Sequence, residues 1–308
     1  MQNEIAPLKA NEFLAAVMKY MDPLKGTHIY DAKKRDYLQK TVYGDVEYGP
    51  WLNSILTHII TNYNYHIDTP AHILDFGCGT GELTVLINHL GYDAVGVDIH
   101  EAHLEVAKIL AHENGINDSI FILNKDKKLP FRDKNFDIVT MFVVLEHLAD
   151  DDLKYILPEL KRVCKGVLYV LVPNKLQATD DHTGLHFLPW MPRWLATLYL
   201  KLRGRKHQYF ISDNGSWDVH YRGLLRIKSL FNKYGFDLDF PPDSKIFPPL
   251  NVAPPISRVG KSIRLGKLSF FLGVPFPHRF MIKAGYPKQA FYPYLNLIFI
   301  PKQSESAG

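Results

Sequence analysis

The sequence predicts an α/β protein built on a doubly wound, mostly parallel sheet of seven strands. Apolar runs of about four to seven residues alternate with amphipathic helical segments along much of the 308-residue chain. Runs that are apolar on both faces indicate strands covered by helices on both sides. A content of 46% hydrophobic and 22% charged residues is typical of a globular protein. No stretch reaches the ~18 apolar residues that a membrane span needs.

The predicted elements follow from the spacing of apolar residues. A helical N-terminal segment comes first, over residues 1–62, because Phe13, Leu14 and Val17 recur at helical spacing. The predicted strands are 71–76, 94–98, 119–123, 136–143, 167–172, 236–240 and 292–300. The predicted helices among them are 80–90, 102–113, 153–163 and 222–234.

Two stretches interrupt this alternation and predict a cap on the core. Residues 176–220 and 241–291 contain no expected strand and are too long for simple connections. We interpret the first as a lid or substrate-binding insertion and the second as a basic insertion rich in Pro and Phe. The core then consists of residues 63–175, a continuation at 221–240, and a last strand with a tail at 292–308.

Charge and cysteine content bound the partners and the compartment. Residues 241–308 carry nine Lys and Arg against two Asp and Glu, whereas the whole chain has a net charge of +4. This surplus favours contact with an anionic membrane surface, a phosphorylated substrate or nucleic acid, and a solvated basic face is the alternative. Two cysteines exclude a disulfide scaffold. Because the first residues do not resemble a secretory signal, we expect a cytoplasmic protein, with peripheral contact to the inner face of the membrane as an option.

The strongest chemical signal follows the strand at 71–76. Residues 75–81 read Asp-Phe-Gly-Cys-Gly-Thr-Gly and open a helix. The glycines allow a sharp turn and close approach of a ligand, and a helix N-terminus offers free N–H groups. The next strand ends at Asp98, where a carboxylate can accept hydrogen bonds from the hydroxyls of an adenosine ribose. Glu82 stands where a dinucleotide fingerprint has its third glycine, so a pyrophosphate cofactor is disfavoured.

An ordered set of segments resembles the small-molecule branch of the class I S-adenosylmethionine-dependent methyltransferases. Beyond the glycine loop, the set comprises Leu-Pro-Phe at 129–131, Asn-Phe-Asp-Ile-Val at 135–139, Val-Leu-Glu-His at 144–147 and Val-Pro-Asn at 172–174. These segments occur in the family's order over residues 70–175. The resemblance implies a Rossmann-like methyltransferase fold, S-adenosyl-L-methionine as the cofactor and an enzyme that transfers its methyl group.

The resemblance also implies roles for individual residues. The acid and the glycines of the loop would hold the amino-acid part of the cofactor, Asp98 the ribose, and Ile99 one face of the adenine. Lys125 or Asp126 would lie near the adenine amino group, and Phe142 would face the methyl group. The implied cofactor-binding residues are Asp75, Gly77, Gly79, Gly81, Asp98, Ile99, Lys125, Asp126 and Phe142.

A hydroxyl acceptor needs a general base, most often a histidine or a carboxylate. His147 follows the fourth strand and is either this base or a structural residue at the start of a helix. His182 and His186 are either a base or substrate contact, or histidines that cap a loop. Their spacing of four fits metal ligation only on a regular helix, which Gly184 and nearby prolines disfavour, so no metal is expected.

The acceptor side is predicted from the two insertions. Residues 193–203 would form a helix with an apolar stripe of Trp194, Leu195, Leu198, Tyr199 and Leu202, which favours a lid over the pocket; contact with an anionic membrane is the alternative. Residues 262–282 again mix bulky apolar and basic groups. The stretch 182–192 resembles insertions in bacterial methyltransferases associated with cell-surface polysaccharide synthesis.

The predicted function is O-methylation of a sugar hydroxyl or another small-molecule alcohol, free or lipid-linked. The partner would be a small-molecule or glycan acceptor. An RNA methyltransferase is one alternative, because the tail is basic, although nucleic acid is disfavoured by the absence of a recognised RNA-binding module. A non-catalytic partner subunit with the same fold is the other, and the intact Asp75 and Asp98 disfavour it.

Overall fold

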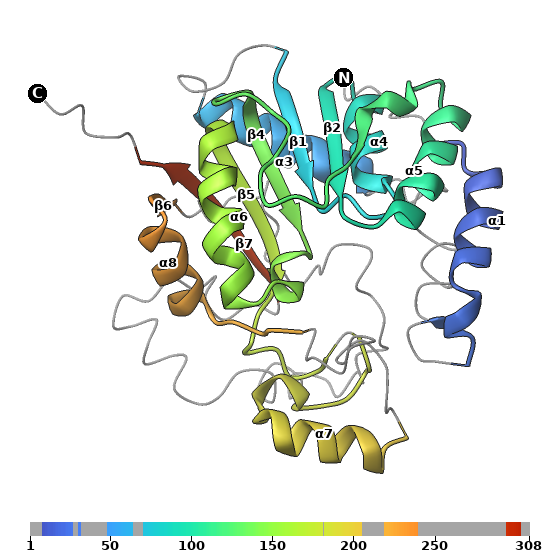
Figure 1. Cartoon of the computed structure of the whole chain (residues 1–308), viewed down its shortest axis with the longest axis vertical. Helices are drawn as coiled ribbons and strands as arrows, with labels where there is room; N and C mark the ends of the chain where they lie inside the picture. Colours follow the sequence, from blue (N-terminus) through green and yellow to red (C-terminus); the bar gives the residue numbers. More distant parts are fainter. Residues whose placement is uncertain are drawn as a thin grey trace, which may run out of the picture.

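A single sheet of seven strands forms the centre of the computed structural model (Figure 1). The structure describes residues 8–26, 30–31, 48–63, 70–180, 182–204, 219–239 and 294–302. The strands are β1 (His72–Phe76), β2 (Asp93–Asp98), β3 (Phe121–Leu123), β4 (Phe136–Phe142), β5 (Cys164–Pro173), β6 (Phe236–Asp239) and β7 (Tyr294–Pro301). Their order is β3-β2-β1-β4-β5-β7-β6; β7 pairs antiparallel with both β5 and β6, and the other strand pairs are parallel. The predicted fold class is confirmed.

Helices cover both faces of this sheet (Figure 1). They are α1 (Asn11–Tyr20), α3 (Tyr48–Asn62), α4 (Glu82–His89), α5 (Glu101–Glu113), α6 (Asp150–Val163), α7 (Arg193–Leu202) and α8 (Leu224–Lys233). Short 3-10 helices are η1 (Asp22–Leu24), η3 (Asp118–Ile120), η4 (Leu145–His147) and η5 (Leu188–Trp190). The N-terminal segment is helical in its described parts, as predicted.

The two faces carry separate hydrophobic cores because successive strand residues point to opposite sides. On β4, Ile138 packs into the core under α1, α3, α4 and α5, whereas Val139 packs into the core under α6 and α8. On β7, Ile298 packs into the first of these cores and Leu297 into the second. The central strands are therefore apolar on both faces, which is the pattern that predicted them.

Two elements begin three residues earlier than the sequence predicts. Helix α6 starts at Asp150 rather than at 153, because acidic residues suit the positive end of a helix and the Asp152 carboxylate accepts the Ala149 N–H at 2.9 Å. Strand β5 starts at Cys164, which pairs with Phe136 ahead of an irregularity in the register. Apolar periodicity alone does not reveal where α6 and β5 begin.

The first insertion is described only in part, and α7 is its main element (Figure 1). The predicted stripe is not the buried face of this helix: Ala196 and Leu200 are buried, whereas Trp194, Leu198 and Leu202 are exposed. The expectation that the stripe packs down as a lid is therefore wrong for these three side chains. Segments 205–218 and 262–282 lie outside the described residues. Within the described part of the chain, no helix has both the length and the apolar content to cross a membrane.

Candidate cofactor and acceptor site

The loop from β1 to α4 has a backbone that requires glycine. Gly77 and Gly81 have φ of +76° and +83°, in the left-handed region. A Cβ at Gly77 would lie 2.6 Å from Val144 Cγ2, and one at Gly81 would lie 2.6 Å from Ala107 Cβ. Beside Gly79, by contrast, there is open space for 4 Å. The loop therefore packs tightly at its two ends and leaves its middle accessible to a ligand.

Asp98 links the end of β2 to this loop. Its Oδ2 accepts the Gly79 N–H at 2.9 Å, its Oδ1 accepts the His100 N–H at 2.8 Å, and His103 Nδ1 lies 3.4 Å from Oδ1. Burial alone would raise the pKa of Asp98, but the hydrogen bonds from His103, His100 and Gly79 outweigh it and lower the pKa. Asp98 is therefore a charged acceptor at neutral pH.

His103 extends this network to the N-terminal helix. Tyr20 Oη on α1 lies 2.8 Å from His103 Nε2, while His103 Nδ1 faces Asp98. The rings of Tyr20 and His103 also meet edge to face, with 5.3 Å between centroids. The sequence analysis missed His103, although its position in the helix after β2 is the signal that could have identified it.

Asp75 lies beneath the loop. It is 2% exposed, and its two oxygens accept hydrogen bonds from Thr84 Oγ1 at 2.6 Å and from Thr140 Oγ1 at 3.0 Å. Burial raises the pKa of Asp75 to about 6, although both hydroxyl hydrogen bonds oppose this rise. The carboxylate thus connects β1, β4 and α4 under the expected position of the cofactor's amino-acid part.

The other expected cofactor contacts lie at the same edge of the sheet. Ile99 is 59% exposed beside Asp98. Lys125 and Asp126 are exposed just after β3. Phe142, at the end of β4, is half-buried and meets Trp51 and Tyr169 edge to face, at centroid distances of 6.2 and 5.2 Å. The carboxyl ends of parallel strands meet along one edge, which is where α/β sheets bind ligands.

The chain after β4 is strained and leads into a buried acidic residue. Val143 has φ of +55°, which is unusual for a β-branched residue, and its N–H donates to Leu171 O at 2.8 Å. Glu146 in η4 is 0% exposed, and among the described residues neither of its carboxylate oxygens has a hydrogen-bond partner. Burial is the main reason that the pKa of Glu146 is raised.

The structure brings His147 and His182 together and leaves His186 elsewhere. The rings of His147 and His182 meet edge to face with 5.6 Å between centroids. One potential ligand atom from each of Glu146, His147 and His182 lies within 4.8 Å of the other two. His186 is exposed, and its Nδ1 lies 2.9 Å from Thr179 Oγ1. We name Glu146, His147 and His182 the Glu-His-His cluster.

A buried carboxylate orients His182. Asp180 is 0% exposed, and its Oδ1 lies 3.3 Å from His182 Nδ1. The Tyr221 hydroxyl donates to the same oxygen and lies 3.1 Å from His182 Nδ1. The other oxygen accepts the Thr183 N–H and hydroxyl at 2.6 and 2.5 Å. These contacts hold the pKa of Asp180 low despite its burial. The next residue, Asp181, lies outside the described residues.

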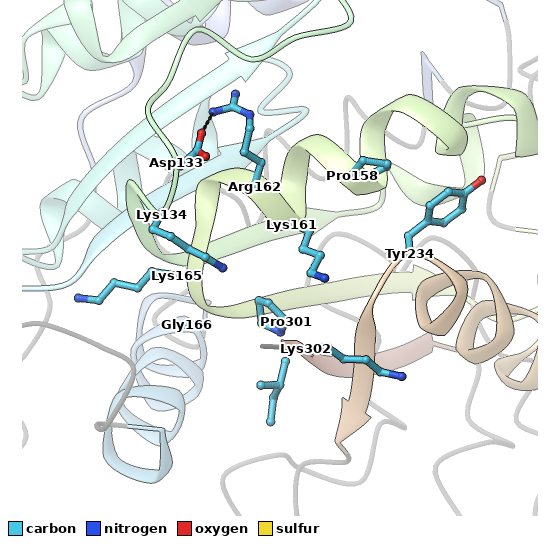
Figure 2. Close-up of a pocket in the computed structure, with 11 residues that line it drawn as sticks. Asp133, Lys134, Pro158, Lys161, Arg162, Lys165, Gly166, Tyr234, Pro301 and Lys302 are labelled. Atoms are coloured by element: carbon cyan, nitrogen blue, oxygen red, sulfur yellow. Dashed lines mark hydrogen bonds and ion pairs between the residues drawn. The ribbon is translucent and has the colours of Figure 1, made fainter. Parts of the chain in front are cut away.

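A cavity of about 700 Å³ is lined by none of the residues of the glycine loop or the Glu-His-His cluster. Figure 2 shows the side chains that line it. Lys134 and Lys165, at the amino-terminal ends of β4 and β5, help to line it, so it opens at the edge opposite the glycine loop. Three of its cations are paired: Arg162 with Asp133 and Glu159, Lys165 with Asp137, and Lys302 with Asp237. The cavity is therefore not part of the expected cofactor site.

Comparisons with known proteins agree with the geometry at the glycine loop. Residues 73–166 match the family model described as a methyltransferase domain. Over these residues the chain is therefore similar to a methyltransferase domain, in agreement with the resemblance seen in the sequence. The "Ubiquinone biosynthesis O-methyltransferase" of Bartonella tribocorum is 28% identical over 145 residues, which cover 46% of this chain and 58% of the relative. The "Demethylmenaquinone methyltransferase" of Thermotoga maritima is 29% identical over 183 residues, which cover 56% and 73%.

The methyltransferase domain is only part of the chain. The chain spans about half the length of the first curated relatives that it matches. Among solved structures, the YcgJ protein of Bacillus subtilis is 18% identical, with a TM-score of 0.45 over 82% of this chain and 99% of that chain. The cofactor expected from the sequence, S-adenosyl-L-methionine, is the cofactor of this class of domain.

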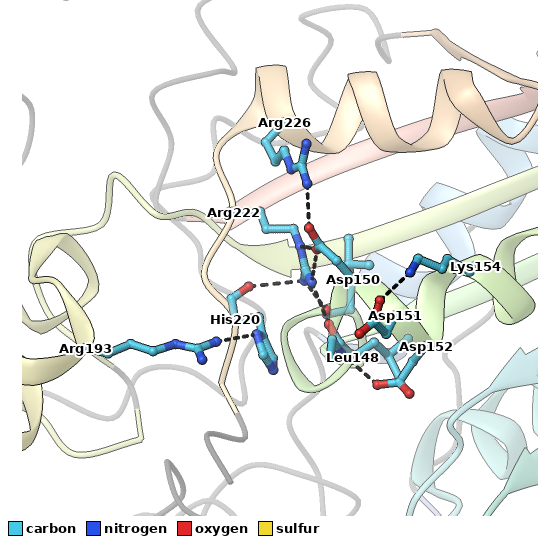
Figure 3. Close-up of polar contacts among 11 residues, drawn as sticks. Leu148, Asp150, Asp151, Asp152, Lys154, Arg193, His220, Arg222 and Arg226 are labelled. Carbon is cyan, nitrogen blue, oxygen red and sulfur yellow. Dashed lines mark hydrogen bonds and ion pairs between the residues drawn. The ribbon is translucent and has the colours of Figure 1, made fainter.

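Arg222 joins the methyltransferase domain to the segment before α8 (Figure 3). Its guanidinium donates to Leu145 O at 2.9 Å, to Leu148 O at 2.6 Å and to His220 O at 3.2 Å, and it pairs with Asp150 at 2.8 Å. Both ends of η4 are thereby fixed. Arg222 was not among the predicted site residues, since it lies in no pattern that distinguishes it from surface residues. Glu146 lies in the Val-Leu-Glu-His segment at 144–147, but no role was predicted for it.

Proposed function

We propose that this protein transfers a methyl group from S-adenosylmethionine to a hydroxyl oxygen of a small-molecule acceptor. The observation that carries the proposal is the Glu-His-His cluster. Its members Glu146 and His147 lie two and three residues after Val144, whose side chain packs against Gly77 of the glycine loop. A group that can activate a hydroxyl is thus close in sequence to a residue that packs on the loop that would hold the methyl donor. The names of the two relatives, which concern ubiquinone biosynthesis and demethylmenaquinone, also support a small-molecule acceptor.

The reaction is an in-line displacement. The acceptor oxygen forms a bond to the methyl carbon while the carbon–sulfur bond breaks, so the sulfonium becomes the neutral thioether of S-adenosylhomocysteine. The hydroxyl proton leaves the acceptor, and His147 or His182 is the group that takes it. Because the donor is already activated, the protein contributes chiefly alignment and exclusion of water.

The cofactor would be held by the residues at the carboxyl edge of β1 and β2. We assign the ribose hydroxyls to Asp98, because its carboxylate is charged and already accepts two backbone N–H groups at this edge. We assign the amino-acid part to the loop around Gly79, where there is open space, with Asp75 beneath it. Ile99, Lys125 or Asp126, and Phe142 complete the site as expected from the sequence.

The acceptor would be a sugar hydroxyl or another alcohol, free or lipid-linked. The exposed apolar side chains of α7 support a lipid-linked form: Trp194 and Leu202 are 70% and 75% exposed, and Lys201 and Arg203 lie beside them. Apolar residues flanked by basic ones suit the surface of an anionic membrane. Such a surface would bring the site close to a lipid-borne substrate.

The test follows a labelled methyl group. The protein is incubated with methyl-labelled S-adenosylmethionine and a fractionated extract of its source cells, and label is counted in the lipid, glycan, small-molecule, RNA and protein phases. We expect label in the lipid, glycan or small-molecule phase, reduced at least 100-fold in His182→Gln. His186→Gln is the matched control and should keep the wild-type rate.

Each of the following results would contradict the proposal. Label in RNA would establish the RNA methyltransferase. Cofactor binding without label in any phase would establish the non-catalytic subunit. Equal losses in His182→Gln and His186→Gln would refute the role of the cluster.

A further inference from the structure

The Glu-His-His cluster contains a carboxylate that the fold buries without using. Glu146 is 0% exposed, and in the described part of the chain neither Oε1 nor Oε2 accepts a hydrogen bond. A buried carboxyl group without partners is unfavourable in either protonation state, so it requires a compensating ligand or function. The positive charge of Arg222 opposes the rise in the pKa of Glu146, but the guanidinium donates its hydrogen bonds to backbone carbonyls and to Asp150 instead. The carboxylate therefore remains available to a group that is not part of the chain.

We propose that Glu146, His147 and His182 bind one divalent cation. The three side chains come from two segments, η4 and the loop after β5, and their candidate ligand atoms lie within 4.8 Å of one another. One carboxylate and two imidazoles form the protein ligand set of several catalytic zinc sites and suit other first-row ions. Ligand atoms in a tetrahedral zinc site with bonds of about 2.1 Å lie about 3.4 Å apart, so the ion draws the three side chains inward.

The surroundings of His182 are those of a metal ligand. Histidines that bind metal usually have a carboxylate on the other ring nitrogen, which fixes the ring and its tautomer. Asp180 Oδ1 lies 3.3 Å from His182 Nδ1, and the Tyr221 hydroxyl lies 3.1 Å from the same nitrogen. Nε2 is accordingly the nitrogen that we assign to the ion. Asp180 is itself held by Thr183, so this support is rigid.

An ion with three protein ligands keeps a position open for an acceptor oxygen. Coordination lowers the pKa of a bound hydroxyl, so the acceptor proton passes to solvent and the oxygen stays on the ion as the nucleophile. With the ion bound, His147 and His182 act as ligands, and the acceptor proton passes to solvent instead of to either histidine. Binding of the ion is independent of the proposed function, whereas this role in activating the acceptor rests on it.

The test uses the metal alone. The full chain is stripped with EDTA, and Zn²⁺ and Mn²⁺ are titrated separately by calorimetry, with no cofactor or acceptor present. We expect saturable binding of one equivalent of at least one of these ions. Binding should weaken at least 100-fold in Glu146→Gln and His182→Gln, and 10- to 100-fold in Asp180→Asn. His186→Gln, in the same segment as His182, should bind as the wild type does.

The melting temperature separates ligation from a structural role. Glu146→Gln removes an unpartnered buried acid while keeping its shape, so the metal-free variant should melt at or above the wild-type temperature and lose the stabilisation that the ion gives. No binding of either ion, or unchanged binding in Glu146→Gln, would overturn the inference. Methyl transfer that persists in metal-free protein would overturn the role of the ion. Metal binding without methyl transfer would uphold the site and refute the proposed function.

Discussion

Replacing Arg222 tests whether η4 is held from outside the methyltransferase domain. Arg222 is 6% exposed and supplies hydrogen bonds to three carbonyls, those of Leu145, Leu148 and His220. In Arg222→Met these acceptors lose their donor, at a cost of about 1 kcal/mol each. Asp150 contributes little to the loss, because its side chain is 46% exposed and regains water. We therefore expect Arg222→Met to lower the free energy of unfolding by about 3 kcal/mol.

Arg226→Met is the matched control for this substitution. Arg226 pairs with the other oxygen of Asp150 at 2.5 Å, but its side chain is 58% exposed (Figure 3). Its loss should change the free energy of unfolding by less than about 1 kcal/mol. Urea unfolding measures both variants, and an unchanged denaturant slope shows that the difference is one of stability. Equal destabilisation of the two variants would refute the reasoning, since it would mean that the buried carbonyl contacts contribute nothing.

Three further predictions concern the cofactor edge. Asp98→Ala should weaken binding of S-adenosylhomocysteine at least tenfold, about 1.4 kcal/mol, in a calorimetric titration; an unchanged affinity would remove the ribose assignment. Gly81→Ala should destabilise the protein more than Gly79→Ala in thermal unfolding, because both have positive φ but only at Gly81 would the new Cβ meet Ala107 at 2.6 Å. Asp75 has a pKa of about 6 in the folded state against an ordinary 3.8, so the native state binds a proton that the unfolded state releases. Wild-type stability should therefore fall relative to Asp75→Asn as pH rises from about 4 to 6, by about 2–3 kcal/mol, and parallel pH curves would contradict this.

The fold was predictable because its determinants are local or periodic. Both faces of β4 and β5 are buried, so these strands are continuous apolar runs in the sequence. The helix faces follow the period of 3.6 residues in the same way. What periodicity could not show was where polar residues extend an element, as at Asp150, or which apolar side chains stay exposed, as at Trp194 on α7.

The backbone geometry of the glycine loop was also predictable, because it constrains the residues of the loop strongly. Gly77 and Gly81 have positive φ and close neighbours that exclude a side chain. The glycines of the motif are therefore the residues that this backbone requires. Asp98 accepts the Gly79 N–H from the loop after β1 and the His100 N–H just after β2, and these contacts favour an acid at the end of β2. The position of His103 in the helix after β2 indicates its place beside Asp98, but no spacing in the sequence indicates its contact with Tyr20 of α1.

The arrangement of the residues that we propose for the acceptor could not be predicted, because they belong to three separate loops. His182 and His186 are equivalent in the sequence, yet Asp180 and Tyr221 hold His182 near His147, whereas Thr179 contacts His186 at the surface. The contacts that distinguish His182 from His186 thus include Tyr221, which lies in the segment before α8. This segment also connects to η4 through the hydrogen bond from His220 N–H to Glu146 O at 2.6 Å. Substitutions of the residues that make these contacts are therefore expected to change the geometry of the Glu-His-His cluster. Under the proposed function, acceptor specificity can then change through this part of the chain while the glycine loop stays intact.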